Sequence, residues 1–532
     1  MRKVLVGLAL LVPSIVVAVM PPPKSKKDPI PHFFQPENWW PAPEQKGRAF
    51  SLTNKPVVSQ PVMLPFANVK VSDDILGRPQ HEPHLAVYGS KVYALFKDWR
   101  TGSRQRVFFA RSLDSGNSWQ PNYQIIEPTT LLNSDPVIKV HPNSDPFACI
   151  LGRGVFVARS IDQGSSFDTA RKASLQPPTD GIDKQWMEIG PSGNIYVAWN
   201  AIIDFGPVTD IRLARSTDEG TTWSSWLRLN DNPPFDSTSF RIGVQIVEGP
   251  DGILHALWGW DDRDGIPGIY KTTSTDSGRS FGSNRLVAHQ VLNDSMPWRT
   301  GLLPSAAVDR TNGNVYVTWY DSRFRPGFTD IAFARSTDDG ATWDSVIFVN
   351  VTTIGDRTQQ FMPAIAVDPF GRVFLIWYDT RTRVSGGNTV DVFYSYSEDF
   401  GQTWAAETRI TTVGSVPVLD SYSNAVMGDY NGLVADGRAL YAVWGDSRNG
   451  NQDIYFARIP TPSPLCMNVK GDMDGNGIYS VVDVVHLINC TFLDLGFCDI
   501  CYTDVNCDGI PTPADVVLEL NRVFLDVPFP CQ

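Results

Sequence analysis

The sequence lacks the features that mark nucleic-acid-binding and membrane-spanning proteins. It holds 45 Lys and Arg against 57 Asp and Glu among its 532 residues, and its formal net charge is -12. Duplex binding depends on clustered Lys and Arg that neutralise phosphates, so nucleic acid is excluded as a partner. The apolar run that begins at Val4 is shorter than the ~20 residues of a bilayer span, and Pro13 interrupts it. With 42% hydrophobic residues, the chain still has ample material for a large core.

The start of the chain is typical of an exported protein. Arg2 and Lys3 precede the apolar run, and the small side chain of Ala18 suits cleavage after it. We therefore predict a signal peptide over 1–18 and a secreted or cell-surface protein with no membrane span after cleavage; an uncleaved anchor is the alternative. Residues 19–63 are Pro-rich and predict an extended linker.

Cysteine is nearly absent from the large middle region, where Cys149 stands alone. The other six cysteines fall in the last 67 residues, at Cys466, Cys490, Cys498, Cys501, Cys507 and Cys531. An even, local set in an exported chain predicts disulfides that hold a small domain. A zinc site at the Cys498-x-x-Cys501 pair is the alternative.

One short phrase, Ser-x-Asp-x-Gly-x-x-aromatic, is written six times. Its copies begin at Ser112, Ser160, Ser216, Ser274, Ser336 and Ser397, at intervals of 48 to 62 residues. Runs of alternating β-branched and aromatic residues precede each copy, as in NVYVTWYDS and DIAFARS. The unit of strand, turn, strand, loop, strand, Asp phrase and strand predicts one four-stranded blade of a β-propeller.

The repeats predict an all-β propeller over 64–460, with seven blades and six as the alternative. Seven inner strands are expected to begin near Glu82, Asp135, Lys184, Ile242, Leu302, Phe361 and Asn424. The seventh unit has no Asp phrase and no fourth strand. We expect residues 67–74 to supply that strand and close the ring, because a closed ring leaves no long exposed sheet edge.

The repeated aspartates are interpreted as structural. In the turn after the third strand, the aspartate accepts backbone N–H bonds and the glycine adopts a positive φ, while the final Trp or Phe packs between blades. These aspartates are Asp114, Asp162, Asp218, Asp276, Asp338 and Asp399. A catalytic site requires one constellation and not six equivalent copies.

The six phrases resemble the Asp boxes of the sialidase superfamily, and residues 64–460 resemble its propellers. For an enzyme, the resemblance implies three arginines that clamp a sugar carboxylate, a tyrosine nucleophile beside a glutamate, and an aspartate acid/base. A guanidinium matches a carboxylate in two hydrogen bonds. The family's first arginine lies in a Phe/Tyr-Arg-Ile-Pro motif near the start of the propeller. This chain lacks it there, and its one Arg-Ile-Pro, at Arg458, ends the last blade strand and is interpreted as a chance match.

Strand direction locates the expected site. Loops between blades and loops joining strands two and three share one face, here called the loop face, and the Asp boxes lie on the other. Arg241, Arg299 and Arg357 precede inner strands, while Arg100, Arg323, Arg381 and Arg448 follow second strands. All are candidates to bind substrate, but each of the last four has an aspartate two residues earlier, so a local ion pair is the alternative. The candidate acid and nucleophile residues are Asp183, Glu188, Asp429 and Tyr430, with polar lining of the channel mouth as the alternative.

The C-terminal region, 461–532, carries two twelve-residue loops that predict two Ca²⁺ sites. Oxygen ligands recur at positions 1, 3, 5, 9 and 12, with glycine at position 6 and a backbone carbonyl at position 7. The ligands are Asp472, Asp474, Asn476, Ile478, Ser480 and Asp483 in the first loop, and Asp504, Asn506, Asp508, Ile510, Thr512 and Asp515 in the second. Each loop leads into a helical pattern of apolar residues, and no helix precedes either loop.

This duplicated loop-helix unit resembles a type I dockerin, the module that attaches secreted enzymes to cohesin scaffolds. Cohesin-reading dockerins tend to carry Ser-Thr at loop positions 10 and 11, where this chain has Val481-Val482 and Pro513-Ala514. A cohesin-type partner, a surface-attachment role and an intramolecular stabiliser therefore stay open. The two resemblances together predict a secreted, sialidase-like glycoside hydrolase that acts on extracellular glycans, with a non-catalytic glycan- or protein-binding propeller as the alternative.

Overall fold

The computed structural model describes residues 66–530 with internal gaps. The gaps are 103–104, 127, 129–132, 175–179, 204–208, 232–240, 260–266, 292–302, 352–356, 383–388, 420–424, 462–469, 474–477, 494–502 and 507–511. The predicted signal peptide and linker lie outside the described residues. No helix within the described residues is long and apolar enough to cross a membrane.

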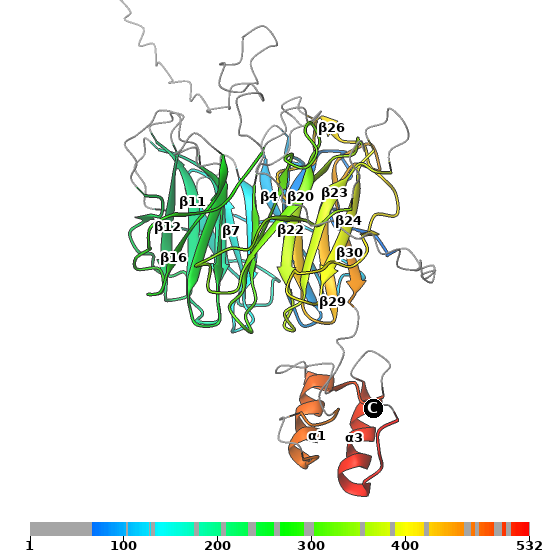
Figure 1. Cartoon of the computed structure of the whole chain (residues 1–532). Coiled ribbons are helices and arrows are strands. Elements are labelled where there is room, and N and C mark those ends of the chain that lie inside the picture. The colour runs from blue at the N-terminus through cyan, green and yellow to red at the C-terminus, as the bar shows by residue number, and fades with distance from the viewer. Residues whose placement is uncertain are drawn as a thin grey trace, which may run out of the picture. The chain divides into compact units, whose positions relative to one another are not determined.

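The chain folds into seven four-stranded antiparallel sheets, the blades of a propeller (Figure 1). Blades one to three are β2 (Gln80–Tyr88), β3 (Lys91–Asp98), β4 (Arg106–Ser112) and β5 (Tyr123–Gln124); β6 (Ser134–Val140), β7 (Pro146–Leu151), β8 (Val155–Arg159) and β9 (Arg171–Lys172); and β10 (Gly181–Ile189), β11 (Ile195–Ile202), β12 (Thr209–Ser216) and β13 (Leu227–Arg228).

Blades four to six follow the same order. They are β14 (Ile242–Glu248), β15 (Leu254–Gly259), β16 (Gly268–Ser274) and β17 (Arg285–His289); β18 (Ser305–Val308), β19 (Val315–Asp321), β20 (Asp330–Ser336) and β21 (Ile347–Phe348); and β22 (Gln360–Val367), β23 (Val373–Asp379), β24 (Asp391–Ser397) and β25 (Thr408–Arg409). The short hairpin β26 (Val418–Leu419) and β27 (Ala425–Val426) precedes blade seven.

Blade seven is built from both ends of the propeller. It consists of β28 (Gly432–Ala435), β29 (Ala439–Asp446), β30 (Asp453–Pro460) and β1 (Val69–Lys70). Val69 lies opposite Phe456, and the Val71 amide donates to the Ile454 carbonyl at 2.8 Å. The predicted closure is therefore confirmed, and the six-bladed alternative is wrong.

The seventh inner strand begins later than predicted. The sequence suggested a start near Asn424, which lies outside the described residues, whereas β28 starts at Gly432. Gly428 adopts a φ of 94°, a left-handed conformation that ends the preceding hairpin before the inner strand can begin. The residues between them, at 429–431, are thereby left at the mouth of the central channel.

Aromatic residues of the second strands form the core between neighbouring blades. Trp199, Trp258, Trp319, Trp377 and Trp444 occupy this place in blades three to seven and are fully buried. Replacing one buried Trp by Ala typically costs about 3–5 kcal/mol. These residues belong to the runs of β-branched and aromatic residues from which the strands were predicted.

The repeated phrase forms the predicted turn, as Asp218 illustrates. Its carboxylate accepts from the Ser216 hydroxyl at 2.7 Å and from the Thr222 amide and hydroxyl at 2.9 and 2.6 Å. Gly220 adopts a φ of 79°, and Glu219 before it also lies in the left-handed region at 55°, which the sequence did not predict. The final aromatic residue packs against the previous blade in several copies: Trp119 meets Phe456 edge to face, with ring centroids 5.3 Å apart.

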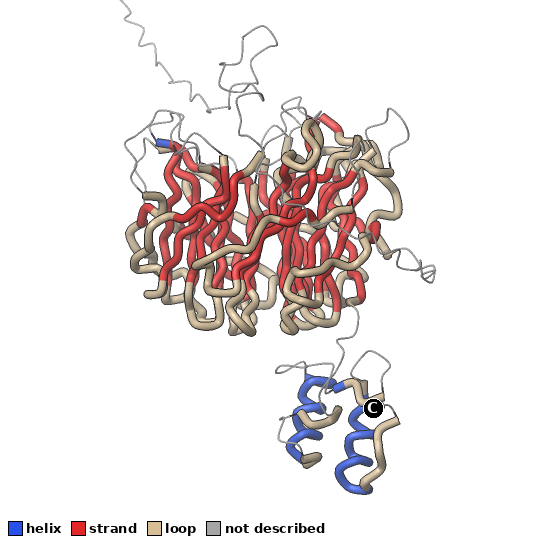
Figure 2. The backbone as a smooth tube through the Cα atoms, viewed as in Figure 1, coloured by secondary structure: helices blue, strands red, loops and turns tan. Residues whose placement is uncertain are grey.

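The longest helices among the described residues lie in the C-terminal region (Figure 2). They are α1 (Val481–Ile488), continued by one π-helical turn η4 (Asn489–Leu493), and α3 (Pro513–Leu525). Ser480 and Asp483 form a capping box at α1, and Thr512 and Asp515 form another at α3. Cys490 is disulfide-bonded, while Cys149 is a free, buried thiol. The other five C-terminal cysteines lie outside the described residues, so their pairing stays a prediction.

Candidate functional site

The inner strands of all seven blades enclose a central channel with a volume of about 610 Å³. Its wall includes apolar residues such as Leu85, Val137 and Met362 and charged residues such as Asp135, Lys184 and Glu188. His84 accepts a backbone N–H at its Nδ1, and burial lowers its pKa to about 3, so its imidazole is neutral. The channel is therefore a cavity with both apolar and charged side chains in its wall.

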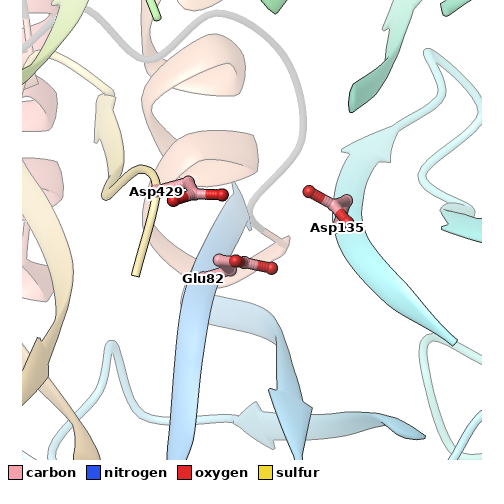
Figure 3. Close-up of side chains that lie close together, drawn as sticks. All are labelled: Glu82, Asp135 and Asp429. Carbon is pink, nitrogen blue, oxygen red and sulfur yellow. The ribbon is translucent and has the colours of Figure 1, made fainter. Parts of the chain in front are cut away.

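Three buried carboxylates converge at the loop-face end of the channel (Figure 3). Glu82, Asp135 and Asp429 come from blades one, two and seven, and their oxygens lie within 4.8 Å of one another. Lys184, from blade three, places its Nζ 2.5 Å from both Asp135 Oδ1 and Asp429 Oδ2. The Lys97 ammonium lies 2.6 Å from Glu82 Oε2. Two lysines thus balance part of the negative charge of this cluster, here called the channel-mouth cluster.

Bulges in the inner strands place these side chains. The register of β2, β6 and β10 shifts just where the cluster residues lie. Glu82, Asp135 and Lys184 adopt φ values of 55°, 50° and 44°, in the left-handed region that residues with a Cβ avoid. Pro83 and Pro136 follow two of them, although a residue before proline normally prefers extended backbone. The same bulge recurs in β14 at Gly243 and in β22 at Met362, so it is a repeated feature of the inner strands that redirects the side chain at this height.

Burial and neighbouring charges shift the pKa values of Asp183 and Lys184 in the channel-mouth cluster. Burial raises the pKa of Asp183 to about 6, with further contributions from the neighbouring Asp135 and Asp429 and against the attraction of Lys184. Burial lowers the pKa of Lys184, but Asp135 and Asp429 outweigh burial and hold it well above its usual value. The mouth therefore contains a carboxyl group that is half protonated near pH 6 beside carboxylates paired with an ammonium.

Three of the four residues predicted for acid and nucleophile roles lie in this region. Asp183, Asp429 and Tyr430 surround Lys184, whose Nζ lies 5.8 Å from the centre of the Tyr430 ring. The Tyr430 hydroxyl donates to the Pro136 carbonyl at 3.2 Å. Burial and the nearby carboxylates raise the pKa of Tyr430 well above its usual value, so it stays a phenol.

Glu188 does not join the other three. It lies at the opposite end of the channel, where its carboxylate meets Lys139 Nζ at 2.7 Å and an Arg310 guanidinium nitrogen at 2.8 Å. The two positions are five residues apart on β10, and a strand rises about 3.3 Å per residue. The expected grouping of Glu188 with Asp183 at one mouth is therefore wrong, because the strand runs the length of the channel between them.

The arginines after the second strands form local ion pairs with aspartates, which was the alternative to substrate binding. Arg323, Arg381 and Arg448 place guanidinium nitrogens 2.6 to 2.8 Å from Asp321, Asp379 and Asp446, and Arg100 does the same with Asp98 at 2.7 Å. In three blades the buried Trp two residues before the aspartate donates to the same carboxylate, at 2.9 to 3.1 Å. The recurring Trp-x-Asp-x-Arg pattern in the sequence was the signal for this network.

The arginines before the inner strands do not form a clamp in the described residues. Arg241 is buried and donates to the Thr209 carbonyl at 2.7 Å. Arg357 is exposed, and Arg299 lies outside the described residues. Three arginines converging on one point, as the sialidase resemblance implies, are therefore not seen among the residues that the structure describes.

Sequence reasoning did not assign roles to Glu82, Asp135 and Lys184. The signal was present, because each falls at the start of a predicted inner strand, in HEPH, SDPV and DKQW. Positions at the same height in different blades meet around the axis of a propeller. Charged residues at that height, in strands that are otherwise apolar, indicate a shared cluster.

Two further side chains of the channel wall hold buried acceptors. Gln185 donates its amide nitrogen to the Asp135 carbonyl, and Asn431 donates its own to the Met362 carbonyl at 3.2 Å. The Gln185 Oε1 and Asn431 Oδ1 atoms are buried and have no hydrogen-bond partner. A buried acceptor without a donor costs free energy, so each indicates a place for a donating group.

The predicted calcium loops have the donor chemistry that a cation requires. Asp472, Asp483, Asp504 and Asp515 are buried, while Asp474, Asn476, Asp508 and Ile510 lie outside the described residues. The Glu519 carboxylate is also buried, lies against Gly471 beside the first loop, and has no hydrogen-bond partner. Ser480 and Thr512 use their hydroxyls to cap the helices, and Asn506 donates its amide to Asp515 at 3.1 Å. Buried carboxylates gathered in this way fit Ca²⁺, whose ligands are oxygens.

No protein-family model matches the chain. A sialidase of Paraclostridium sordellii is 26% identical over 146 residues, which are 25% of this chain and 35% of that protein. The match thus spans about a third of the relative.

The fold is similar to those of several solved structures. A protein of unknown function from Dyadobacter fermentans DSM 18053 has a TM-score of 0.45 at 14% identity, over 75% of this chain and 99% of its own. The Hadza microbial sialidase Hz136 has a TM-score of 0.39 at 15% identity, over 69% and 73%. An ulvan lyase of family PL25 has a TM-score of 0.45 at 11% identity, over 74% and 95%. The likeness is one of fold, and no reaction follows from it.

Proposed function

We propose that this chain is a secreted glycan-acting propeller, and that it hydrolyses a glycoside at the channel-mouth cluster. The observation that carries the proposal is a carboxyl group with a raised pKa, Asp183, in the same cluster as Asp429, which is ion-paired with Lys184. The pKa of Asp183 is raised to about 6, whereas Asp429 faces the Lys184 ammonium at 2.5 Å. Glycosidases require one carboxylic acid and one carboxylate on opposite sides of the bond that breaks.

In this mechanism Asp183 donates its proton to the glycosidic oxygen as the bond to the sugar breaks. The Asp429 carboxylate acts on the opposite side, either by attacking the sugar carbon or by taking a proton from the attacking water. Lys184 holds Asp429 in position through its ion pair. Water completes the hydrolysis, and Asp183 regains its proton.

A carboxyl pair suits this mouth better than the tyrosine-glutamate pair of sialidases. Tyr430 donates to a backbone carbonyl, and its pKa is raised well above its usual value, so a phenolate nucleophile is disfavoured. Glu188, the glutamate predicted for the site, is held by Lys139 and Arg310 at the other end of the channel. The sialidase-like part of the sequence interpretation therefore rests on the fold and not on this site.

The competing function is a propeller that binds glycan without cleaving it. It is favoured by the two buried acceptors, Gln185 and Asn431, which offer hydrogen bonds but no chemistry. A panel of aryl glycosides with the full chain distinguishes the two. We expect turnover of at least one glycoside, and a loss of about 10²–10⁴-fold in kcat/KM for Asp183→Asn. Asp218→Asn, on the opposite face, is the matched control and should keep full activity. If the chain binds glycans but cleaves no glycoside of the panel, the hydrolase proposal is rejected and the binding function is retained.

We further propose that the C-terminal region binds two Ca²⁺ ions and attaches the protein to a cohesin-type or surface scaffold. The buried carboxylates of each loop repel one another without a cation, so calcium binding would stabilise the fold. Val481, Val482, Pro513 and Ala514, at loop positions 10 and 11, are exposed and available to a partner. An intramolecular stabiliser is the remaining alternative.

Calorimetry of the full chain in calcium and in chelator tests the metal sites. We expect a C-terminal transition that rises by several degrees with calcium, because a ligand that binds only the folded state stabilises it. Combining Asp472→Ala with Asp504→Ala should abolish the rise, whereas the propeller transition should not move. Identical melting in calcium and chelator would contradict the calcium proposal and the dockerin-like role built on it.

A further inference from the structure

The charge of the mouth bears on which sugar can react there. Four carboxyl groups, those of Glu82, Asp135, Asp183 and Asp429, face the ammonium groups of Lys97 and Lys184. His81 is close by, but burial lowers its pKa and it is neutral. The cluster therefore carries a net charge between -1 and -2, depending on whether Asp183 is protonated. A carboxylate of the substrate would meet like charge in a poorly solvated site.

The hydrogen-bonding groups point the same way. Gln185 and Asn431 hold buried oxygens for which the described residues supply no donor, and each amide nitrogen donates to one backbone carbonyl. A sugar carboxylate is acceptor-only, so it cannot satisfy an acceptor. A sugar hydroxyl donates, and an ammonium group donates three times. The two unsatisfied oxygens of the wall therefore favour donating groups over an anion.

The described lysines of the mouth and the arginines that follow the second strands are already engaged in ion pairs. Lys184 is shared by two aspartates, and Lys97 pairs with Glu82. Arg323, Arg381 and Arg448 are each held by an aspartate of their own blade. Releasing any of them to clamp a carboxylate would break an ion pair and leave an aspartate uncompensated.

We infer that the channel mouth selects glycans whose reacting sugar carries no carboxylate, namely neutral or amino sugars, and discriminates against sialic and uronic acids. The inference rests on the proposed function, because it assigns the substrate class of that site. It is the opposite of what the sialidase resemblance implies. Its physical origin is a net negative, acceptor-rich mouth.

Matched ligands that differ by one charge test the inference with the full chain. The probes are aryl glucuronide and aryl sialoside, each beside its methyl ester, together with the aryl glucoside. Binding is measured by competition with an immobilised neutral oligosaccharide, so the readout does not require turnover. We expect each ester to bind more tightly than its acid, by on the order of 10²-fold. Asp135→Asn should shrink this ratio, whereas Asp218→Asn removes the same charge from the other face and should leave it unchanged.

Each result separates the inference from the proposed function. Neutral ligands that bind but are never cleaved would end the hydrolase proposal and leave the charge selection standing. Acids that bind or react better than their esters would overturn the inference, even if hydrolysis is found. An ester-to-acid ratio that Asp135→Asn leaves unchanged would also overturn it. If neither class binds, the inference and the proposed function fall together. A melting curve for Asp135→Asn establishes that the variant is folded.

Discussion

The same side chain, a carboxyl group, behaves in opposite ways on the two faces of this propeller. In the Asp boxes, hydrogen bonds from the turn lower the pKa, to about 2 for Asp114, Asp218 and Asp338. At the channel mouth, burial and neighbouring carboxylates raise the pKa of Asp183 to about 6. The first group is repeated, exposed and fully bonded, whereas the second is single and enclosed.

The difference shows where chemistry can be placed in a repeat fold. In the turn that recurs in six blades, the carboxylate accepts hydrogen bonds from the turn itself, because each copy serves to stabilise one blade. The channel axis is the one place where blades contribute unlike residues at the same height, as Glu82, Asp135 and Lys184 do. A repeated motif thus marks the scaffold, and the exceptions around the axis mark the site.

The largest expected loss of stability comes from removing Lys184, the cation at the centre of the channel-mouth cluster. Lys184→Met leaves Asp135 and Asp429 buried without their counter-charge, and breaking such a pair costs about 3–5 kcal/mol of unfolding free energy. Urea unfolding measures the loss. The matched control is Lys172→Met on an exposed strand, which should change stability by less than about 0.5 kcal/mol. Equal stability of the two variants would mean that the mouth is not an enclosed charge cluster.

An effect of intermediate size is expected in how Asp183 makes the stability of the propeller depend on pH. The folded pKa of Asp183 lies above its unfolded value, so its contribution to stability is present at low pH and is lost as pH rises through about 6. Asp183→Asn should therefore gain stability relative to the original chain between pH 4 and pH 8, by about 1–2 kcal/mol. Melting curves across this range give the sign, and a constant difference would contradict the raised pKa.

The smallest expected effect comes from a single Asp box. Asp218 has a folded pKa below its unfolded value, so its contribution is present at neutral pH and is lost as pH falls toward about 2. Asp218→Asn weakens the hydrogen bonds of one of six similar turns in a large domain. It should lower the melting temperature by about 2 °C at pH 7. The difference from the original chain should shrink in acid. A drop as large as that of Lys184→Met would erase the distinction between the two faces.

The fold was largely predictable because its signals are local. Strand alternation and the repeated turn define each blade, and the missing fourth strand in the seventh unit pointed to residues 67–74. The late start of β28 was missed, because a left-handed Gly428 is not distinguishable from other glycines in the sequence.

The site was predictable only in part because it is assembled from four blades. Asp429 and Asp183 could be named from their place before inner strands, but bulges decide which side chains point to the axis. Those bulges bring in Glu82, Asp135 and Lys184, whereas Glu188 lies at the other end of the channel because β10 runs the length of the channel. Arg323 and Arg381 form the local ion pairs that the sequence offered as the alternative to substrate binding.

The strand that closes the ring has a consequence for how the protein is made. The Ser72 hydroxyl accepts a hydrogen bond from the Ile454 amide, which lies 382 residues later in the chain. The last blade therefore cannot form until nearly the whole propeller has been synthesised. Contacts of such sequence separation are slow to form, because the entropy of closing the intervening loop is lost first. Until then the first segment of the domain stays an unpaired strand beside an open seventh position. The final folding step of the propeller therefore waits for the C-terminal end of the domain.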